Sequence, residues 1–260
     1  MSLATAQVSA TPIRAVSSHD AAAAVLPLKT QCSQCHLRDL CLPCGMSGAD
    51  VDRLDTMKFT RRSVKEGQAL YHEGDAFHFI YALRNGTFKS SLSLADGREQ
   101  VSGFQISGEL LGLDGLAEGK YASSATALED TVVCAIPYAH LTELANSSAG
   151  MQRAVSRLMS REIVRDHNLL MLLGSMNAEE RLATFLLNLS RRLQARGYSP
   201  GEFVLRMTRA EIGSYLGMKL ETVSRTFSAF QRQGLLEVVK RHIRILDMAG
   251  LVRVHQAQMH

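Results

Sequence analysis

Residues 208–236, TRAEIGSYLGMKLETVSRTFSAFQRQGLL, decide the fold of the C-terminal part of this chain. Thr208 followed three residues later by Glu211 fits a capping box, which predicts the start of a short helix over about 209–216. Gly217 interrupts the pattern, and a second helix is predicted over about 220–233. Two helices around a short turn that contains glycine are the outline of a helix-turn-helix.

The second helix of this motif carries side chains that suit DNA. The apolar positions that form a small core are Ile212, Leu216, Val223, Phe227 and Phe230. Glu221, Ser224 and Arg225 then lie on the outer face near the helix start, where a recognition helix meets base edges. Arginine donates two bonds to guanine, glutamate accepts from cytosine, and a serine hydroxyl serves a base or a phosphate.

The charge distribution agrees with a polyanionic partner. Residues 1–150 carry 12 Lys and Arg against 16 Asp and Glu, whereas residues 151–260 carry 17 against 9. Thr208, Arg209 and Lys219 are further candidate DNA contacts. A following hairpin makes the motif a winged one, with basic side chains near the phosphates at Lys240, Arg241 and Arg244. The alternative is an ordinary helical hairpin with a solvated basic face.

Residues 32–45, CSQCHLRDLCLPCG, hold four of the five cysteines, and Cys134 is the fifth. Four thiols this close can together hold a structural zinc ion. An iron–sulfur cluster is the second alternative, and it commonly takes several close thiolates and a distant one. The spacing alone does not separate these alternatives, and reduced thiols without a ligand are the third. His36 is a possible zinc ligand but is more typical of a solvated loop.

The spacing of apolar residues differs between residues 58–137 and residues 146–176. In the first, short apolar runs alternate with turn dipeptides such as Asn85-Gly86, which predicts an all-β sandwich or barrel. The second predicts one long helix with two apolar stripes at coiled-coil spacing. Such a helix either pairs with another copy or packs only on its own domain. The stripes are Met151, Val155, Leu158, Glu162, Arg165, Leu169, Leu172, Met176, and Gln152, Ser156, Met159, Ile163, Asp166, Leu170, Leu173.

Several classes of protein are disfavoured. No apolar run approaches the roughly 20 residues of a membrane span. The first 29 residues lack the pattern of a signal peptide and are predicted to form a flexible tail, so we expect a cytoplasmic protein without membrane contact. We find no nucleophile–base pair and no phosphate-cradling glycine loop, so an enzyme is not expected.

The chain from about residue 30 to 250 resembles the cyclic-AMP receptor (CRP/FNR) superfamily, and within it the FNR-type oxygen-sensing transcription regulators. The resemblance implies an α+β fold with a β-roll, a long dimerisation helix and a winged helix-turn-helix. The expected division is a tail over 1–29, a cysteine-rich loop over 30–45, a β-roll over 46–145, a dimerisation helix over 146–176 and a DNA-binding domain over 177–260. The matching segments are CSQC (32–35), LYHEGD (70–75), IYALRNGTFKS (80–90), VVCAIP (132–137), NAEERLATFLLNLSRR (177–192) and MTRAEIGSYLGMKLETVSR (207–225).

The resemblance also implies a cofactor and excludes a ligand. In that family a [4Fe–4S] cluster is held by three N-terminal cysteines and one in the β-domain. The matching positions are Cys32, Cys35, Cys41 and Cys134, while Cys44 departs from the pattern and is a possible extra ligand. Relatives that bind cyclic AMP use a glutamate and an arginine where this chain has Leu113 and Ser123, so no cyclic-nucleotide binding is expected.

The resemblance further implies partners. Two copies pair along a dimer interface made by Met159, Ile163, Asp166, Leu170 and Leu173. Asp166 meets its twin across the interface and restrains pairing by charge repulsion. The dimer reads a palindrome resembling TTGAT-N4-ATCAA, and the turn at Asp96 and Gly97 contacts RNA polymerase.

The expected function is therefore oxygen-responsive regulation of transcription, in which the cluster promotes dimerisation and DNA binding and is lost in air. Two other functions stay open on the residues. The first is a zinc-bound or cluster-free regulator of the same superfamily that senses another signal. The second is an iron–sulfur electron-transfer protein, which the helix-turn-helix disfavours.

Overall fold

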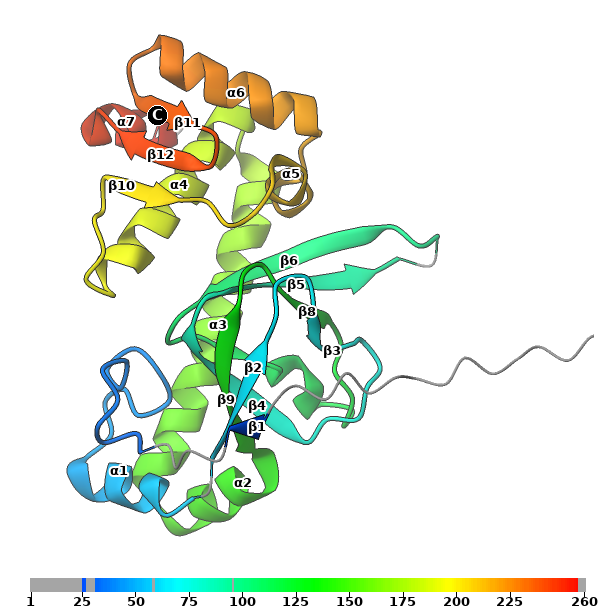
Figure 1. Ribbon diagram of the computed structural model, residues 1–260, viewed down its shortest axis with the longest axis vertical. Helices are drawn as coiled ribbons and strands as arrows, with labels where there is room; N and C mark the ends of the chain where they lie inside the picture. Colours follow the sequence, from blue (N-terminus) through cyan, green and yellow to red (C-terminus); the bar gives the residue numbers. More distant parts are fainter. Residues whose placement is uncertain (1–24, 27–30, 58, 95, 257–260) are drawn as a thin grey trace, which may run out of the picture.

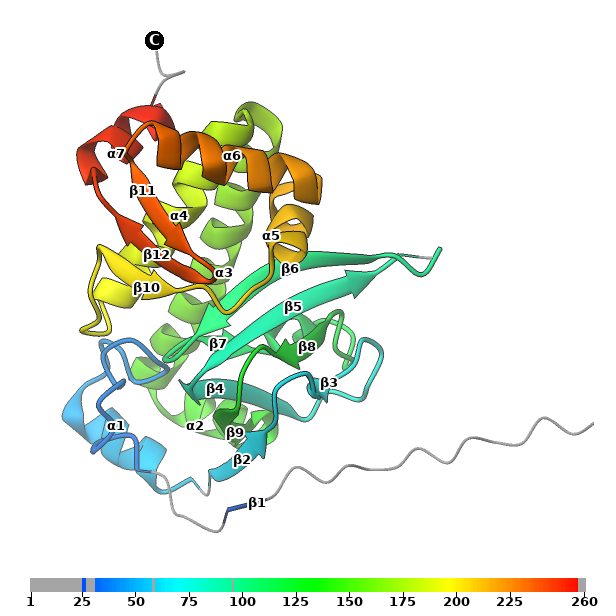
Figure 2. The same cartoon turned by 45° about the horizontal axis from the view of Figure 1, so that its top comes forward.

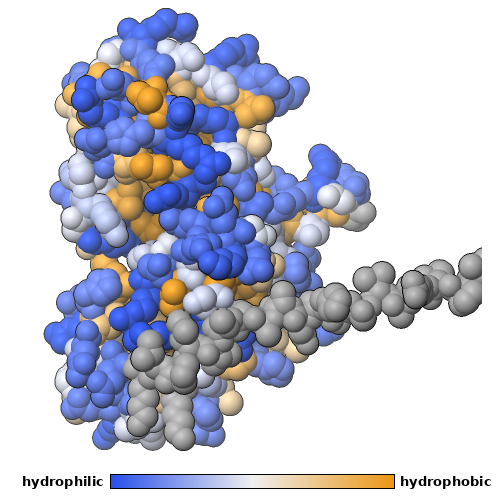
Figure 3. Space-filling model, in the orientation of Figure 1, coloured by the Kyte–Doolittle hydropathy of each residue, from blue (hydrophilic) through white to orange (hydrophobic). Residues whose placement is uncertain are grey.

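The computed structural model describes residues 25–26, 31–57, 59–94 and 96–256. A β-roll and a helical domain are connected by one long helix, α3 (Ala149–Ser175), which passes along both (Figure 1). Most of the tail predicted over 1–29 lies outside the described residues, and its described part is the short strand β1 (Val25–Leu26). On the face in Figure 3, hydrophilic residues predominate with hydrophobic residues scattered among them. Among the described helices, none combines the length and apolar composition of a membrane span.

The β-roll consists of two antiparallel sheets, with strand orders β1-β2-β9-β4-β7 and β3-β8-β5-β6. The all-β prediction for this region is confirmed. Asn85-Gly86 forms the turn between β4 and β5, where Gly86 has φ +90° and an added Cβ would clash with Thr131 Cγ2. The strands are β2 (Thr60–Val64), β3 (Ala69–Tyr71), β4 (Phe79–Asn85), β5 (Thr87–Ser93), β6 (Glu99–Ile106), β7 (Leu110–Leu111), β8 (Ser124–Ala127) and β9 (Thr131–Pro137), with a 3-10 helix η1 (Leu113–Leu116) after β7.

One face of the five-stranded sheet packs against the interior of the β-roll, and the other packs against helices. Along β9 the side chains alternate, as they do in any strand, so Val133 and Ala135 face the interior of the roll. Cys134 and Ile136 face the other way, towards α1 (Gly48–Asp55), α2 (Tyr138–Ser147) and the first half of α3.

The long helix starts later than the sequence predicts. The prediction placed its start at residue 146, but residues 138–147 form the separate helix α2. Ser148 has an extended backbone with ψ 115°, and its side chain accepts a hydrogen bond from Met151 N at 3.3 Å. This N-cap ends one helix and starts the next.

The structure separates the two stripes of α3. From the first stripe Met151, Leu158 and Leu172 are buried against the same chain. From the second, Ile163 is 54% exposed and Leu170 is 67% exposed, with Asp166 also exposed between them. We call Met159, Ile163, Asp166, Leu170 and Leu173 the outer stripe. Packing on its own chain therefore explains the first stripe. Within the outer stripe Met159 and Leu173 are half-buried, and Leu173 packs on the helical domain, but Ile163 and Leu170 are left in solvent.

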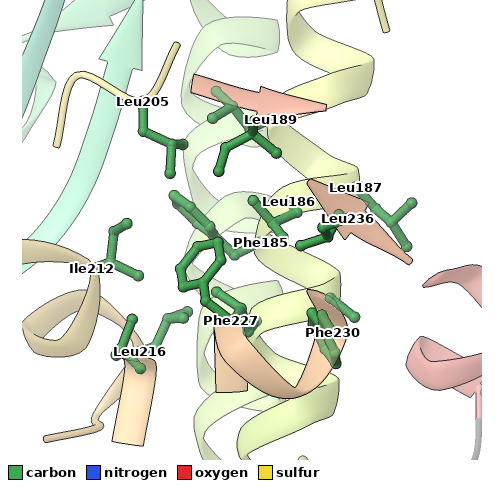
Figure 4. Packing of buried hydrophobic residues seen from close by; sticks show 14 of the residues in the cluster. Phe185, Leu186, Leu187, Leu189, Leu205, Ile212, Leu216, Phe227, Phe230 and Leu236 are labelled. Atoms are coloured by element: carbon green, nitrogen blue, oxygen red, sulfur yellow. The ribbon is translucent and has the colours of Figure 1, made fainter. Parts of the chain in front are cut away.

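The helical domain is a winged helix-turn-helix, as predicted. Both capping boxes form, at Asn177 with Glu180 and at Thr208 with Glu211. Its core gathers leucine and phenylalanine side chains from α4, α5, α6 and the wing (Figure 4). The elements are α4 (Ala178–Gln194), β10 (Glu202–Val204), α5 (Arg209–Leu216), α6 (Leu220–Arg232), β11 (Leu236–Val239), β12 (His242–Ile245) and α7 (Met248–Gln256), of which the sequence did not predict α7.

Candidate metal centre and nucleic-acid interface

The cysteine loop, residues 32–45, is a chain of tight turns. The amide of Cys35 donates to Cys32 O at 3.2 Å, and the amide of Cys44 donates to Cys41 O at 3.1 Å. The carboxylate of Asp55, at the end of α1, accepts from the backbone amides of Cys32 and Ser33. These bonds anchor the start of the loop to the β-roll side of the molecule.

Four of the five thiols line one cavity between this loop and the sheet. Cys32, Cys35 and Cys41 come from the loop, and Cys134 comes from β9. Cys134 lies in the middle of the sheet, opposite Arg61 of β2 and Ala82 of β4, so three strands fix its position. The cavity measures about 30 Å³, and the other residues that line it are Leu37, Arg38, Leu42, Pro43, Phe59, Ala82, Leu83, Arg84 and Ile136.

The fifth thiol points elsewhere. Cys44 does not line the cavity, and its Sγ lies 3.2 Å from a guanidinium nitrogen of Arg161 on α3. His36, the possible zinc ligand, is exposed and does not line the cavity either. The cavity is thus lined by three thiols of the loop and the thiol of β9, and neither Cys44 nor His36, either of which could complete a zinc site within the loop, lines it.

Burial sets the protonation of the cavity thiols. It raises the pKa of Cys41 to about 12, although a hydrogen bond from the Leu42 backbone opposes the shift. It raises the pKa of Cys32 still further, and the neighbouring Cys41 adds to that effect. All five cysteines are described, and none forms a disulfide. A metal centre would therefore displace protons from these thiols, because thiolate is the ligand form.

The donor set of this cavity fits an iron–sulfur cluster, which takes four cysteine thiolates. Its other walls are largely apolar, and they come from the loop and from the sheet. Among the described residues, however, no three His, Cys, Asp or Glu side chains already stand in a metal-binding arrangement. The thiols are gathered around one space without a preformed coordination geometry.

The interior of the β-roll is filled by aromatic rings. The rings of Tyr71 and Tyr121 stack with centroids 3.8 Å apart, and Tyr81 stacks on Tyr71 at 5.8 Å. Ser123, one of the two positions where the resemblance implies a glutamate and an arginine in cyclic-AMP binders, donates a hydrogen bond to the carboxylate of Asp114 at 2.6 Å. A carboxylate in this place repels a phosphate instead of pairing with it.

The predicted DNA-reading residues lie on one surface of the helix-turn-helix. Glu221, Ser224 and Arg225 are exposed on the first turns of α6, and Lys219 is exposed immediately before it. Such a row at the start of the second helix is the arrangement that reads base edges in the major groove.

The other two predicted DNA contacts have structural partners. The Thr208 hydroxyl caps α5 by accepting from Glu211 N at 3.2 Å. The Arg209 guanidinium lies 3.4 Å from the centroid of the Phe227 ring, and burial lowers its pKa to about 10. Thr208 is still exposed, whereas Arg209 is half-buried.

Two further predicted contact sites are exposed loops. In the wing, Lys240 adopts φ 56° at the turn between β11 and β12, and Arg244 pairs with Glu237 at 2.5 Å. At the tip of the β5–β6 hairpin, the Asp96 carboxylate accepts from Arg98 Nε at 2.7 Å, and the neighbouring Gly97 has φ +83°. Neither loop is covered by the rest of the described chain, so both are accessible to a partner.

Comparison with known proteins agrees with this architecture. A cyclic nucleotide-binding domain model matches residues 61–148, and a Crp-like helix-turn-helix domain model matches residues 180–254. The transcriptional regulatory protein btr of Bordetella pertussis is 46% identical over 225 residues, which span 86% of this chain and 93% of that protein. The fumarate and nitrate reduction regulatory protein of Escherichia coli is 42% identical over 86% of this chain and 89% of its own length.

Solved structures show the same arrangement of domains. FixK2 of Bradyrhizobium japonicum matches with a TM-score of 0.71 and 31% identity, covering 76% of this chain and 98% of that chain. The c-di-GMP responsive regulator CLP of Xanthomonas campestris shares the fold, with a TM-score of 0.62 at 21% identity over 77% of this chain and 100% of that chain. These relatives are regulators of transcription and not enzymes.

Proposed function

Because this chain belongs to the CRP/FNR family of transcription regulators, we propose that it is the oxygen-responsive kind, which binds DNA as a homodimer when it carries a [4Fe–4S] cluster. One observation carries the proposal: Cys32, Cys35, Cys41 and Cys134 line a single cavity, whereas Cys44 does not line it and contacts Arg161 instead. That grouping favours the cluster over a zinc ion held by the four thiols of the loop alone.

The cluster, when bound, supplies the reactivity towards oxygen, and the protein supplies its attachment. Cys134 would join the cysteine loop to the central strands of the sheet. The end of the loop contacts α3, where Arg157 donates to Gly45 O at 3.1 Å and Arg161 reaches Cys44. A change in the loop therefore acts directly on the helix that carries the outer stripe.

The outer stripe is the proposed dimer interface. Ile163 and Leu170 offer apolar surface, and Asp166 lies exposed between them. In a symmetric parallel pair the two Asp166 carboxylates approach each other, and their repulsion opposes assembly. Contacts between the cluster-bound cysteine loop and α3 need to offset only a few kcal/mol of this repulsion to shift the population towards the dimer.

Dimerisation would place two recognition helices about 34 Å apart, one turn of DNA. Glu221, Ser224 and Arg225 would then read each half of a palindrome such as TTGAT-N4-ATCAA. Replacing Arg225 by alanine should cost about 1–3 kcal/mol at its base pair.

Two parts of the proposal concern other partners. The stacked tyrosines and the Asp114 carboxylate support the absence of cyclic-nucleotide binding. The exposed hairpin tip at Asp96 and Gly97 is the proposed contact with RNA polymerase.

The direct test is iron and sulfide analysis of protein purified without oxygen, with visible absorption spectra and operator binding measured before and after exposure to air. We expect iron and sulfide near four of each per chain, and loss of dimer and of operator affinity in air. Absence of both elements, with operator affinity unchanged by air, contradicts the proposal. In a second test, Asp166→Ala should dimerise in air; a variant that still needs anaerobic conditions would rule out the repulsion.

A further inference from the structure

The helical domain is attached to the β-roll of the same subunit through a buried carboxylate. Glu109, in the turn between β6 and β7, is only 10% exposed. Arg192 of α4 donates to both of its oxygens, at 2.9 Å from Nε and 2.5 Å from Nη2. Arg196, just beyond α4, donates to the same carboxylate at 2.9 Å.

The long helix takes part in this cluster. Arg165, next to Asp166 of the outer stripe, has a nitrogen 3.8 Å from Glu109 Oε2. Burial opposes ionisation of Glu109, but attraction by Arg192 and the other arginines outweighs it and lowers the pKa of this carboxyl. One charged side chain thus connects the sensor domain, the dimerisation helix and the DNA-binding domain. We call Glu109, Arg165, Arg192 and Arg196 the arginine cluster.

A second contact lies at the other end of the same interface. The β5–β6 hairpin runs beneath α5 (Figure 2), where the amide of Val101 donates to Ser214 Oγ at 2.9 Å. Between this contact and the arginine cluster, Phe104 of β6 packs against Phe185 and Tyr215, with centroids 6.1 and 5.3 Å away.

Two further ion pairs cross the interface, Lys89 with Glu211 at 3.4 Å and Arg206 with Glu129 at 3.1 Å, and their side chains are more exposed than that of Glu109. A cavity of about 280 Å³ lies among β6, α3, α4 and α5, and another of about 300 Å³ lies between the β-roll and the segment from α4 to β10. The aromatic contact holds the domains together, but apolar attraction has no fixed direction. An arginine–carboxylate pair joined by two parallel hydrogen bonds does have a fixed direction, so it can set the relative orientation of the two domains.

We infer that Glu109 is a positioning residue that fixes the angle at which the DNA-binding domain docks on the β-roll, and thereby the half-site spacing that the dimer accepts. The inference rests on the proposed function and adds a determinant of DNA specificity that touches no DNA. The docked domain leaves Glu221, Ser224 and Arg225 exposed, so the contact orients the reading surface and does not block it.

The consequence for DNA follows from geometry. One added base pair between half-sites moves them apart by about 3.4 Å and rotates one against the other by about 35°. A dimer with firmly docked domains loses affinity for the altered spacing. A dimer with loosened domains binds the original site less tightly but discriminates less between the two.

The test compares Glu109→Gln with Glu162→Gln in the full chain prepared without oxygen. Glu162→Gln is the control for charge: Glu162 pairs with Arg165 at 3.0 Å, within α3, so its loss changes the charge near the arginine cluster, while among the described residues it makes no hydrogen bond or ion pair to α4. Hydrogen exchange at Val101, distant from the substitution, should become at least about threefold faster in Glu109→Gln only. The affinity ratio between N4 and N5 palindromes should fall by at least about threefold in the same variant.

A third variant keeps the inference testable if Glu109→Gln does not fold. Arg192→Lys retains the buried charge but loses the fork, and it should lower the affinity ratio in the same way. Unchanged exchange at Val101 and an unchanged ratio in the folded variants overturn the inference. Wild-type protein that fails to bind the palindrome contradicts the proposed function instead, while the exchange measurement, which needs no DNA, still decides the docking role of Glu109.

Discussion

The two faces of the five-stranded sheet have opposite characters. The inner face closes the β-roll, whose interior is filled by stacked tyrosines. The outer face, one residue along the same strand, presents Cys134 to a cavity lined by three more cysteines. The interior of the roll is thus occupied by side chains, and a sensing site is proposed on the opposite face of the sheet. A shared fold does not fix where its ligand binds.

The strongest test of the filled interior is Tyr121→Ala. Tyr121 is 3% exposed, stacks on Tyr71 and donates to Phe79 O at 2.8 Å, so its loss leaves a large cavity and an unpaired carbonyl. We expect the free energy of unfolding to fall by about 3–5 kcal/mol, measured by chemical denaturation of the apoprotein. The iron content of anaerobically prepared protein should not change, and its loss would show that the two faces are not independent.

The outer face is tested by Cys134→Ser against Cys44→Ser. Cys134→Ser should lose iron and at least about a hundredfold in anaerobic operator affinity, a coupling within the usual range of about 1–3 kcal/mol. Cys44→Ser, whose thiol contacts Arg161 and not the cavity, should retain both within about twofold. Measured iron per chain decides the result: equal losses in the two variants would place Cys44 among the ligands.

Alkaline pH should destabilise the inner face. Burial raises the pKa of Tyr71 well above its ordinary value of 10.0, and burial likewise raises the pKa of Tyr121. Above about pH 10 the unfolded chain releases these phenolic protons while the folded chain keeps them, so stability falls as pH rises, by up to about 1.4 kcal/mol per pH unit for each tyrosine. Denaturation of wild type and Tyr121→Phe between pH 9 and 11 measures this; identical slopes would contradict it.

The smallest expected effect is that of cyclic AMP. The interior offers stacked rings and the Asp114 carboxylate in place of a charged partner for the phosphate. Titration calorimetry and the melting temperature should therefore show no change at millimolar nucleotide. Micromolar binding would mean that the tyrosines move aside and that the inner face is still a ligand site.

The sequence predicted the local elements of this protein because their causes are local. The capping box at Thr208, the turn at Asn85-Gly86 and the glycine at 217 each act within a few residues. The spacing of the cysteines and the resemblance to a known family could also be recognised from the sequence alone. The ends of elements were harder to predict: the long helix predicted from residue 146 starts at residue 149.

Only the tertiary structure decided which alternatives are realised. Both stripes of α3 have coiled-coil spacing, and contacts within the chain bury Met151, Leu158 and Leu172 of the first stripe while Ile163 and Leu170 of the other stay exposed. The spacing does not distinguish Cys44 from its neighbours, whereas in the structure it contacts Arg161, 117 positions away in the chain, and does not line the cavity. The role of Glu109 could not be predicted from the sequence, because its partners Arg192 and Arg196 are 83 and 87 residues away in the chain. Caps and turns depend on residues that are adjacent in the chain, so the sequence predicts them. Burial and charge pairing depend on which distant segments come into contact in the folded protein.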